Sequence, residues 1–174
     1  NAEHFNAFRS ENYPPLAEAG VHLRYNYAHI HYPTRPRPLK VYSRLDSRVT
    51  VLKIFPGISP DVLDAVLGIP GLRGLVLETY GSGNAPSNKW FTGRLADAIG
   101  RGLIILNVTQ CPAGKVEMGR YETSLGLAGA GVIGGFDITT EAALTKMMFL
   151  FGQNITNEEI IFCLNKPLRG EITV

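Results

Sequence analysis

The residues best suited to chemistry lie in two short loops, each of which follows an apolar run. In the first loop, Gly81 and Gly83 permit backbone conformations closed to other residues, and Asn84 offers an amide group. In the second loop, residues 107–114, Cys111 places a thiol at the centre of a polar turn. Amides bind polar ligands, and an activated thiol is a nucleophile. Because neither loop is complete by itself, neighbouring segments have to supply the rest of any site.

The sequence around these loops predicts the elements that position them. Four apolar runs break into small or polar residues and then into amphipathic sequence, at residues 49–55, 75–77, 103–106 and 132–133. The run at 75–77 shows no alternation of apolar and polar residues, as expected for a parallel strand covered on both faces. Right-handed crossovers make the four strands parallel and bring their loops to one edge of the sheet, where ligands gather in such folds.

Helical periodicity fills the gaps between the expected strands. Ser59 is the expected N-cap of the first helix, with Pro60 at its first position. Lys146, on a later helix, is expected to face outward or to form a salt bridge. The other expected helices span residues 88–99, 124–130, 142–151 and 157–164. The fold class is therefore α/β: a three-layer Rossmann-like domain with a four-stranded parallel sheet, preceded by an irregular N-terminal segment.

Composition indicates a globular domain attached to something else. The chain has 174 residues, 45% of them hydrophobic, and no apolar run approaches the roughly 20 residues of a membrane span. Residues 1–48 mix aromatic residues, prolines and charges without a period, with a candidate strand at 20–27. We interpret residues 1–48 as the end of a preceding catalytic domain plus a linker, and 49–174 as the α/β domain. The start at Asn1, without a secretion signal, indicates a fragment of a longer protein.

Charge, cysteines and histidines exclude several kinds of site. The net charge is only +2 and basic residues do not cluster at helical spacing, which argues against a nucleic-acid partner. Cys111 and Cys163 match no zinc spacing and are too few for a disulfide framework, which favours a reducing compartment. His29 and His31 would share one face of an extended segment, but a third ligand is missing. We predict no metal site.

Three nucleotide-binding and hydrolase motifs are also missing from the sequence. Residues 81–86 carry the first two glycines of the dinucleotide fingerprint but place Pro86 where the third belongs. Residues 113–116 lack the preceding glycine and the hydroxyl residue of a Walker A loop. No Gly-x-Ser-x-Gly elbow occurs.

Several ordered motifs give the chain a family resemblance. Tyr-Gly-Ser-Gly-Asn-Ala-Pro at 80–86, Asn-Val-Thr-Gln-Cys at 107–111 and Gly-Val-Ile-Gly-Gly-Phe-Asp at 131–137 resemble the C-terminal domain of bacterial type I, cytoplasmic L-asparaginases. Further matching segments lie at residues 2–8, 12–20, 55–59 and 168–173. The resemblance therefore covers the whole chain.

This resemblance implies that the chain is the C-terminal part of a two-domain enzyme. In that family the nucleophilic threonine and the Thr-Asp pair with its lysine belong to a larger N-terminal domain, and those motifs do not occur here. The whole enzyme is expected to hydrolyse L-asparagine to L-aspartate and ammonia in the cytoplasm, without a cofactor. The present chain alone is expected to be inactive, and it should support a homodimer or homotetramer in which the domain packs against a neighbouring subunit's N-terminal domain.

The resemblance also assigns individual residues. Tyr121 lies in the segment that reaches the neighbour's active site in related enzymes. In some type I enzymes a second, activating asparagine is bound at positions matched here by Asn84, Thr109 and Cys111, together with an arginine whose position is held by Glu78. Arginine would clamp the effector's carboxylate, whereas glutamate repels it. We therefore expect activation to be lost and Glu78 to serve as a structural cap or pairing partner.

Local chemistry offers other interpretations of the same residues. Asn84 suits a turn, Cys111 suits a small and at least partly buried position, and Asp137 suits a cap or a loop support near Thr139. Two other functions fit the loops. One is a small-molecule or sugar-phosphate-binding module that cradles an anion at helix starts, and the other is a cysteine hydrolase in which an N-terminal histidine activates Cys111.

Overall fold

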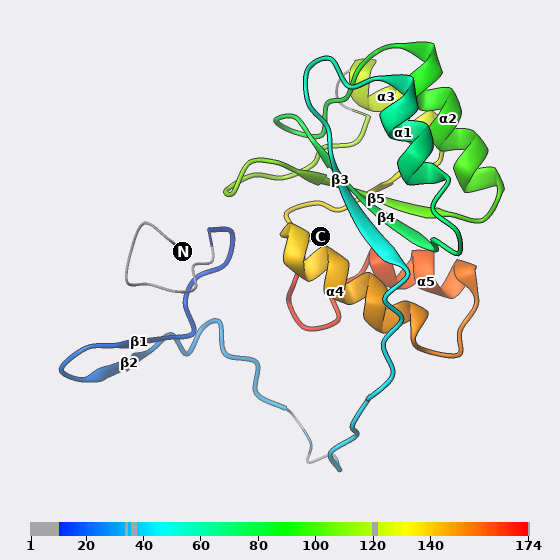
Figure 1. The fold of residues 1–174 in the computed structure, drawn as a ribbon. Helices are drawn as coiled ribbons and strands as arrows, with labels where there is room; N and C mark the ends of the chain where they lie inside the picture. The colour runs from blue at the N-terminus through cyan, green and yellow to red at the C-terminus, as the bar shows by residue number, and fades with distance from the viewer. Residues whose placement is uncertain (1–10, 34, 36–37, 120–121, 174) are drawn as a thin grey trace. The chain divides into compact units, whose positions relative to one another are not determined.

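The computed structural model describes residues 11–33, 35, 38–119 and 122–173. The chain divides into two compact units, residues 1–43 and residues 44–174. In the first unit, β1 (Ala17–Ala19) and β2 (Leu23–Tyr25) form an antiparallel hairpin (Figure 1). The Tyr13 hydroxyl donates to the carbonyl of His29 at 3.2 Å. Of the candidate strand at 20–27, residues 23–25 form one arm of the hairpin and residues 20–22 form its turn.

The second unit is built on a parallel sheet with strand order β3-β4-β5-β6. The strands are β3 (Val49–Lys53), β4 (Gly74–Thr79), β5 (Ile104–Thr109) and β6 (Ile133–Gly134). Every neighbouring pair is parallel, and Thr79 pairs in register with Thr109 at the carboxyl ends of the two central strands. The predicted α/β class, four-stranded parallel sheet and single loop-bearing edge are confirmed.

Helices cover both faces of this sheet, as Figure 1 shows. One face carries α1 (Pro60–Leu67), α2 (Lys89–Gly100) and α3 (Glu122–Gly129). The other face carries α4 (Thr140–Phe151) and α5 (Asn157–Leu164). Among the described residues, no helix is both long and apolar enough to cross a membrane.

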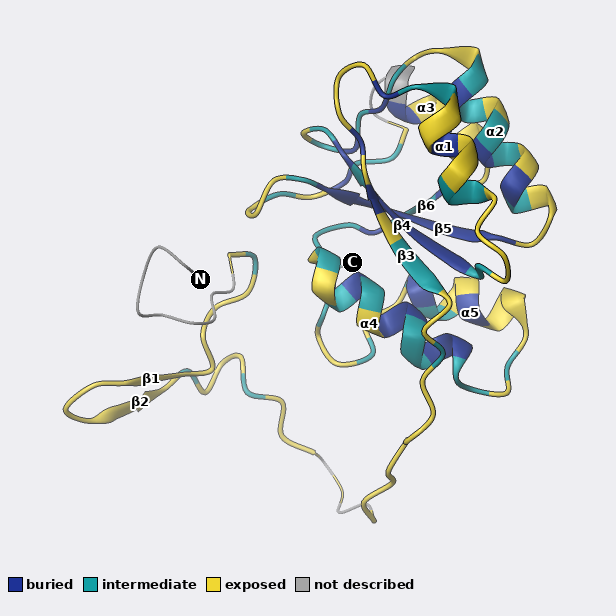
Figure 2. Cartoon of the chain, in the orientation of Figure 1, coloured by how far each residue is buried: buried dark blue, intermediate teal, exposed yellow. Residues whose placement is uncertain are grey.

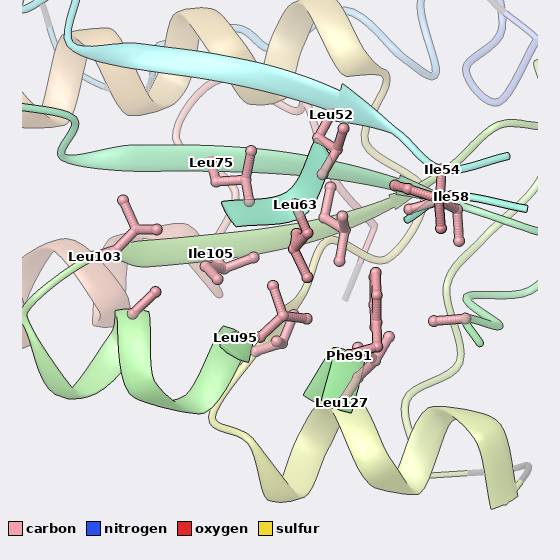
Figure 3. Close-up of a cluster of buried hydrophobic side chains, with 14 residues drawn as sticks. Leu52, Ile54, Ile58, Leu63, Leu75, Phe91, Leu95, Leu103, Ile105 and Leu127 are labelled. Atoms are coloured by element: carbon pink, nitrogen blue, oxygen red, sulfur yellow. The ribbon is translucent and has the colours of Figure 1, made fainter. Parts of the chain in front are cut away.

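Two apolar clusters fill the spaces between sheet and helices. Leu75 and Ile105 point into the first cluster, where they meet Phe91 and Leu95 of α2 (Figure 3), and Leu77 belongs to the same cluster. Alternate residues of the same strands, Val76, Ile104, Leu106 and Val108 among them, point into the second cluster against α4 and α5. The two central strands are therefore dark blue along most of their length in Figure 2, and Glu78 of β4 is the half-buried exception.

Side-chain caps mark the starts of α1, α4 and α5. The Ser59 hydroxyl accepts from the amide of Val62, and Pro60 occupies the first turn of α1, as predicted. Thr156 and Glu159 form a reciprocal capping box at the start of α5, which satisfies two otherwise orphaned amides. These local signals explain why the helix starts could be predicted within a residue or two.

A cluster of charges fastens the start of β3 to the end of α4. Asp46 accepts from Arg48 at 2.6 Å and from Arg73 at 3.0 Å. Arg73 also donates to the carbonyl of Phe151 at 3.1 Å and lies over its ring. The hydrogen bond from Arg48, assisted by Arg73, holds the pKa of the Asp46 carboxyl well below its usual range. Residues 44–48 thus belong with the α/β unit.

Candidate functional site

The loop that follows β4 folds back on itself at the carboxyl edge of the sheet. We call residues 80–84 the rim loop. Tyr80 and Asn84 form an antiparallel bridge, in which the Tyr80 amide donates to Asn84 at 2.9 Å and the Asn84 amide donates back at 2.8 Å. Gly83 has a φ of 104°, a conformation that strongly favours glycine. The predicted role of Asn84 as a turn residue agrees with this geometry.

Thr109 ties the second loop to the rim loop. Its hydroxyl donates to the carbonyl of Gly81 at 2.5 Å and accepts from the amide of Cys111 at 3.0 Å. Asn84, Thr109 and Cys111 therefore sit in two loops that are hydrogen-bonded to each other. Because the single hydroxyl proton of Thr109 is directed at Gly81, this side chain has no proton left to donate to a ligand in this arrangement.

Cys111 is exposed, so the expectation of a buried or partly buried thiol is wrong. Its neighbours Pro112 and Ala113 are exposed as well, because the loop after β5 projects beyond the edge of the sheet (Figure 1). Residues 44–174 contain no histidine, so the α/β unit itself cannot supply an imidazole base to this thiol. Among the described residues, no group of three histidine, cysteine, aspartate or glutamate side chains could hold a metal ion.

Glu78 faces the start of α4 and has a structural partner. The hydroxyl of Thr140, the first residue of that helix, donates to Oε1 of Glu78 at 2.5 Å. A carboxylate is favourable beside a helix N-terminus, where the partial charge is positive. An arginine at position 78 would instead bring a cation to the positive end of α4. The contact explains how glutamate is accommodated here.

Sequence reasoning missed Gln110, which joins the ends of two strands. Its amide nitrogen donates to the carbonyl of Ile54 at 2.7 Å and to that of Glu78 at 3.0 Å. The side chain thereby closes the carboxyl ends of β3 and β4. A single glutamine after a strand carries no sequence signal for such a contact.

A fully buried polar pair, also missed, lies beneath the rim loop. The hydroxyl of Thr79 donates to Oδ1 of Asn107 at 2.7 Å, and both residues are 0% exposed. The available signals were Asn107, which interrupts an apolar run, and Thr79, which follows Glu78 at the end of another. Such residues require partners when buried, because an unpaired polar group inside a protein is costly.

A cleft of about 630 Å³ opens beside this edge, between residues 115–118 and the loop after β6. Lys115 forms an ion pair with Glu117 at 2.9 Å, and Asp137 accepts from the amide of Thr173 at 2.7 Å. Asp137 thus supports a loop, while Thr139 caps α4. Another hollow of about 520 Å³ lies between α1 and α2. This hollow is the weaker candidate for a ligand site, because ligands of parallel sheets bind at the carboxyl ends of the strands.

Tyr121, predicted to complete a neighbour's active site, lies outside the described residues. The described part of the edge holds amide, hydroxyl, thiol and carboxylate groups that support loops. It contains no nucleophile paired with a base.

Comparison with known proteins identifies the family of this domain. The glutaminase/asparaginase C-terminal domain family matches residues 48–162. L-asparaginase 1 of Escherichia coli is 44% identical over 99% of this chain and 51% of its own length. The human 60 kDa lysophospholipase is 39% identical over 99% of this chain and 30% of its own length.

A solved structure of an L-asparaginase has the same fold as this chain. L-asparaginase I from Vibrio cholerae superposes with a TM-score of 0.89 at 40% identity, covering 97% of this chain and 50% of its own. The chain thus spans about half the length of the two bacterial L-asparaginases that it matches. With a family match over most of its length and a parallel sheet of the same fold, this chain belongs to the glutaminase/asparaginase family, as its C-terminal domain.

Proposed function

We propose that this chain is the C-terminal domain of an L-asparaginase that hydrolyses L-asparagine to L-aspartate and ammonia. The observation that best supports this proposal is the similarity to Escherichia coli L-asparaginase 1, which is 44% identical over 99% of the chain and about half of its own length. In this proposal residues 1–48 hold the end of the preceding catalytic domain and the linker, whose last residues, 44–48, pack with the α/β domain of residues 49–174. The enzyme works in the cytoplasm as a homodimer or homotetramer and uses no cofactor.

The domain contributes support and leaves the chemistry to its missing partner. The Thr109 hydroxyl is directed at a backbone carbonyl, and Cys111 has no histidine within its own unit. The loops at the carboxyl edge can instead cover an active site on a neighbouring subunit, with Tyr121 as the residue that reaches it. The chain by itself is then inactive.

In this proposal asparagine does not activate the enzyme by binding at a second site. Glu78 already accepts from Thr140, and its negative charge opposes the carboxylate of an amino-acid effector. Asn84, Thr109 and Cys111 therefore act in the loop architecture and not as ligands of a second asparagine.

A chimaeric enzyme tests the proposal. Residues 1–174 replace the matching half of Escherichia coli L-asparaginase 1, and ammonia release is measured for the chimaera and for the isolated chain. We expect the chimaera to hydrolyse asparagine with a hyperbolic dependence on concentration. The isolated chain should not exceed the uncatalysed rate.

Three outcomes would contradict this view. Hydrolysis by the isolated chain would place a catalytic site within it, and a folded but inactive chimaera would remove the proposed function. A sigmoidal dependence that Thr109→Ala abolishes would restore the activating site. The same substitution in a hyperbolic chimaera should leave the shape of the curve unchanged.

A further inference from the structure

Asn107 is the only asparagine in the strands of the sheet, as far as the structure describes them, and it is 0% exposed. Its Oδ1 accepts from the Thr79 hydroxyl, so the amide is oriented with Nδ2 away from Thr79. A buried carboxamide of this kind specifies one arrangement of its surroundings, because each lost partner leaves a polar group unsatisfied.

The Nδ2 group of Asn107 lies between two segments that are distant in sequence. It donates to the carbonyl of Gly83 in the rim loop at 3.4 Å and to the sulfur of Met118 at 3.5 Å. We call residues 115–118 the strap. The backbone carbonyl of Asn107 also accepts from Gly135 at 2.8 Å, which brings the loop after β6 to the same residue. The two side-chain contacts are long and individually weak, but they converge at a dry position.

The rim loop and the strap also contact each other directly. The Glu117 amide donates to the carbonyl of Ser82 at 3.0 Å. A Cβ atom at position 83 would lie 2.8 Å from Cγ1 of Val116 and 3.2 Å from Nδ2 of Asn107. The glycine is therefore required for close packing of three segments around one amide group.

We propose that Asn107 is a positioning residue that holds the rim loop and the strap in one arrangement, so that both are presented together to a neighbouring subunit. The structural part of the proposal stands on these contacts alone. The presentation to a neighbour rests on the proposed function, in which this edge covers an active site. Thr79 orients the amide but touches neither segment through the contacts described here.

Two variants separate positioning from simple core stability. Both Thr79→Val and Asn107→Leu remove the hydrogen bond between the two side chains. Only Asn107→Leu also removes the Nδ2 contacts to Gly83 and Met118. A purely structural role predicts similar behaviour of the two variants, whereas positioning predicts that only the second releases the loops.

Amide hydrogen exchange in the 174-residue chain gives the first measurement. Asn107→Leu should speed exchange of the Asn84 and Glu117 amides by about tenfold, the effect of about one lost hydrogen bond. Thr79→Val should leave these amides within about twofold of the parent. Equal acceleration in both variants, or acceleration spread evenly through β4 and β5, would overturn the proposal. Asn107→Ser, whose hydroxyl is too short to reach Gly83, serves if the leucine variant does not fold.

Kinetics of the chimaera give the second measurement. Asn107→Leu should raise the KM for asparagine by about tenfold relative to Thr79→Val, because a displaced loop weakens cover over the neighbour's site. If Asn107→Leu accelerates amide exchange but leaves the KM for asparagine unchanged, the proposed presentation of the two segments to a neighbouring subunit is wrong. If the parent chimaera is inactive, the proposed function fails, yet the exchange comparison still decides whether Asn107 positions the loops.

Discussion

Lys146→Met should lower the free energy of unfolding by about 3 kcal/mol or more, the largest loss that we expect from one substitution in this chain. Only 4% of the Lys146 side chain is exposed, and its ammonium group lies 2.7 Å from Oε1 of Glu171. It also donates to the carbonyls of Leu164 and Lys166 at 3.3 and 2.6 Å. Methionine fills similar space but leaves a largely buried carboxylate and two carbonyls without their donor.

Urea denaturation followed by the fluorescence of Trp90 measures this effect. Lys166→Met is the matched control, since it makes the same substitution at an exposed lysine whose ammonium only overlies the ring of Phe162 at 4.9 Å. The control should change stability by about 1 kcal/mol or less. Equal losses of stability in the two variants would show that the buried ion pair contributes no more to stability than the exposed lysine does.

The same pair predicts a pH dependence. Burial alone would raise the pKa of Glu171, but hydrogen bonds from Lys146 and from the amides of Leu168 and Arg169 outweigh it and lower the pKa to about 2. Since the unfolded chain has the higher pKa, the unfolded state binds more protons between the two values, and stability rises with pH there. The contribution is complete above about pH 4.5 and is lost as the pH falls towards 2.

The expected size of this pH effect is about 1–2 kcal/mol, less than the full shift would give because part of the carboxylate meets solvent. Denaturation of the parent and of Glu171→Gln at several pH values from 5 down to about 2 measures it. The difference in stability between the two proteins should shrink as the pH falls. A difference that stays constant through this window would contradict the lowered pKa.

Gly152→Ala should cost about 2 kcal/mol, the typical effect of forcing an atom into a filled space. A Cβ atom at this position would lie 2.7 Å from the carbonyl carbon of Arg44 and 2.9 Å from Cα of Leu45, with the carbonyl oxygen of Arg44 closer still. The backbone there cannot retreat freely, because the Asp46 amide donates to Met148 at 3.0 Å. The φ of Gly152 is an ordinary −76°, so the cost comes from space and not from backbone strain.

Gly100→Ala is the control for this prediction. It places alanine at the end of α2, where a Cβ atom would meet nothing within 4 Å. Stability should stay the same or rise by about 0.5 kcal/mol, because alanine favours the helix more than glycine does. Thermal unfolding of both variants decides the matter: a Gly152→Ala protein as stable as the control would show that residues 44–45 can move away.

The helices, the strands and the edge of the sheet that carries the site could all be predicted from local sequence. The uninterrupted apolar run at Leu75–Leu77 indicated a strand covered on both faces, and Ser59 with Pro60 marked the start of a helix. Parallel topology then required the loops bearing Asn84 and Thr109 to be neighbours, and the bond from Thr109 to Gly81 shows that they are. These inferences succeeded because strand burial, capping and crossover handedness depend on residues close together in sequence.

The burial of the polar residues and the identity of their partners could not be predicted, because they depend on contacts between elements distant in sequence. Lys146 was expected to face outward or to form a salt bridge; it is buried, and its salt bridge runs to Glu171 in the C-terminal segment and not to a residue of its own helix. Cys111 was expected to be at least partly buried, yet it is exposed. Asn107 and Thr79, 28 positions apart, form one hydrogen-bonded pair. Local sequence cannot encode such outcomes, because the burial of a polar side chain is stable only when a partner from another element arrives beside it.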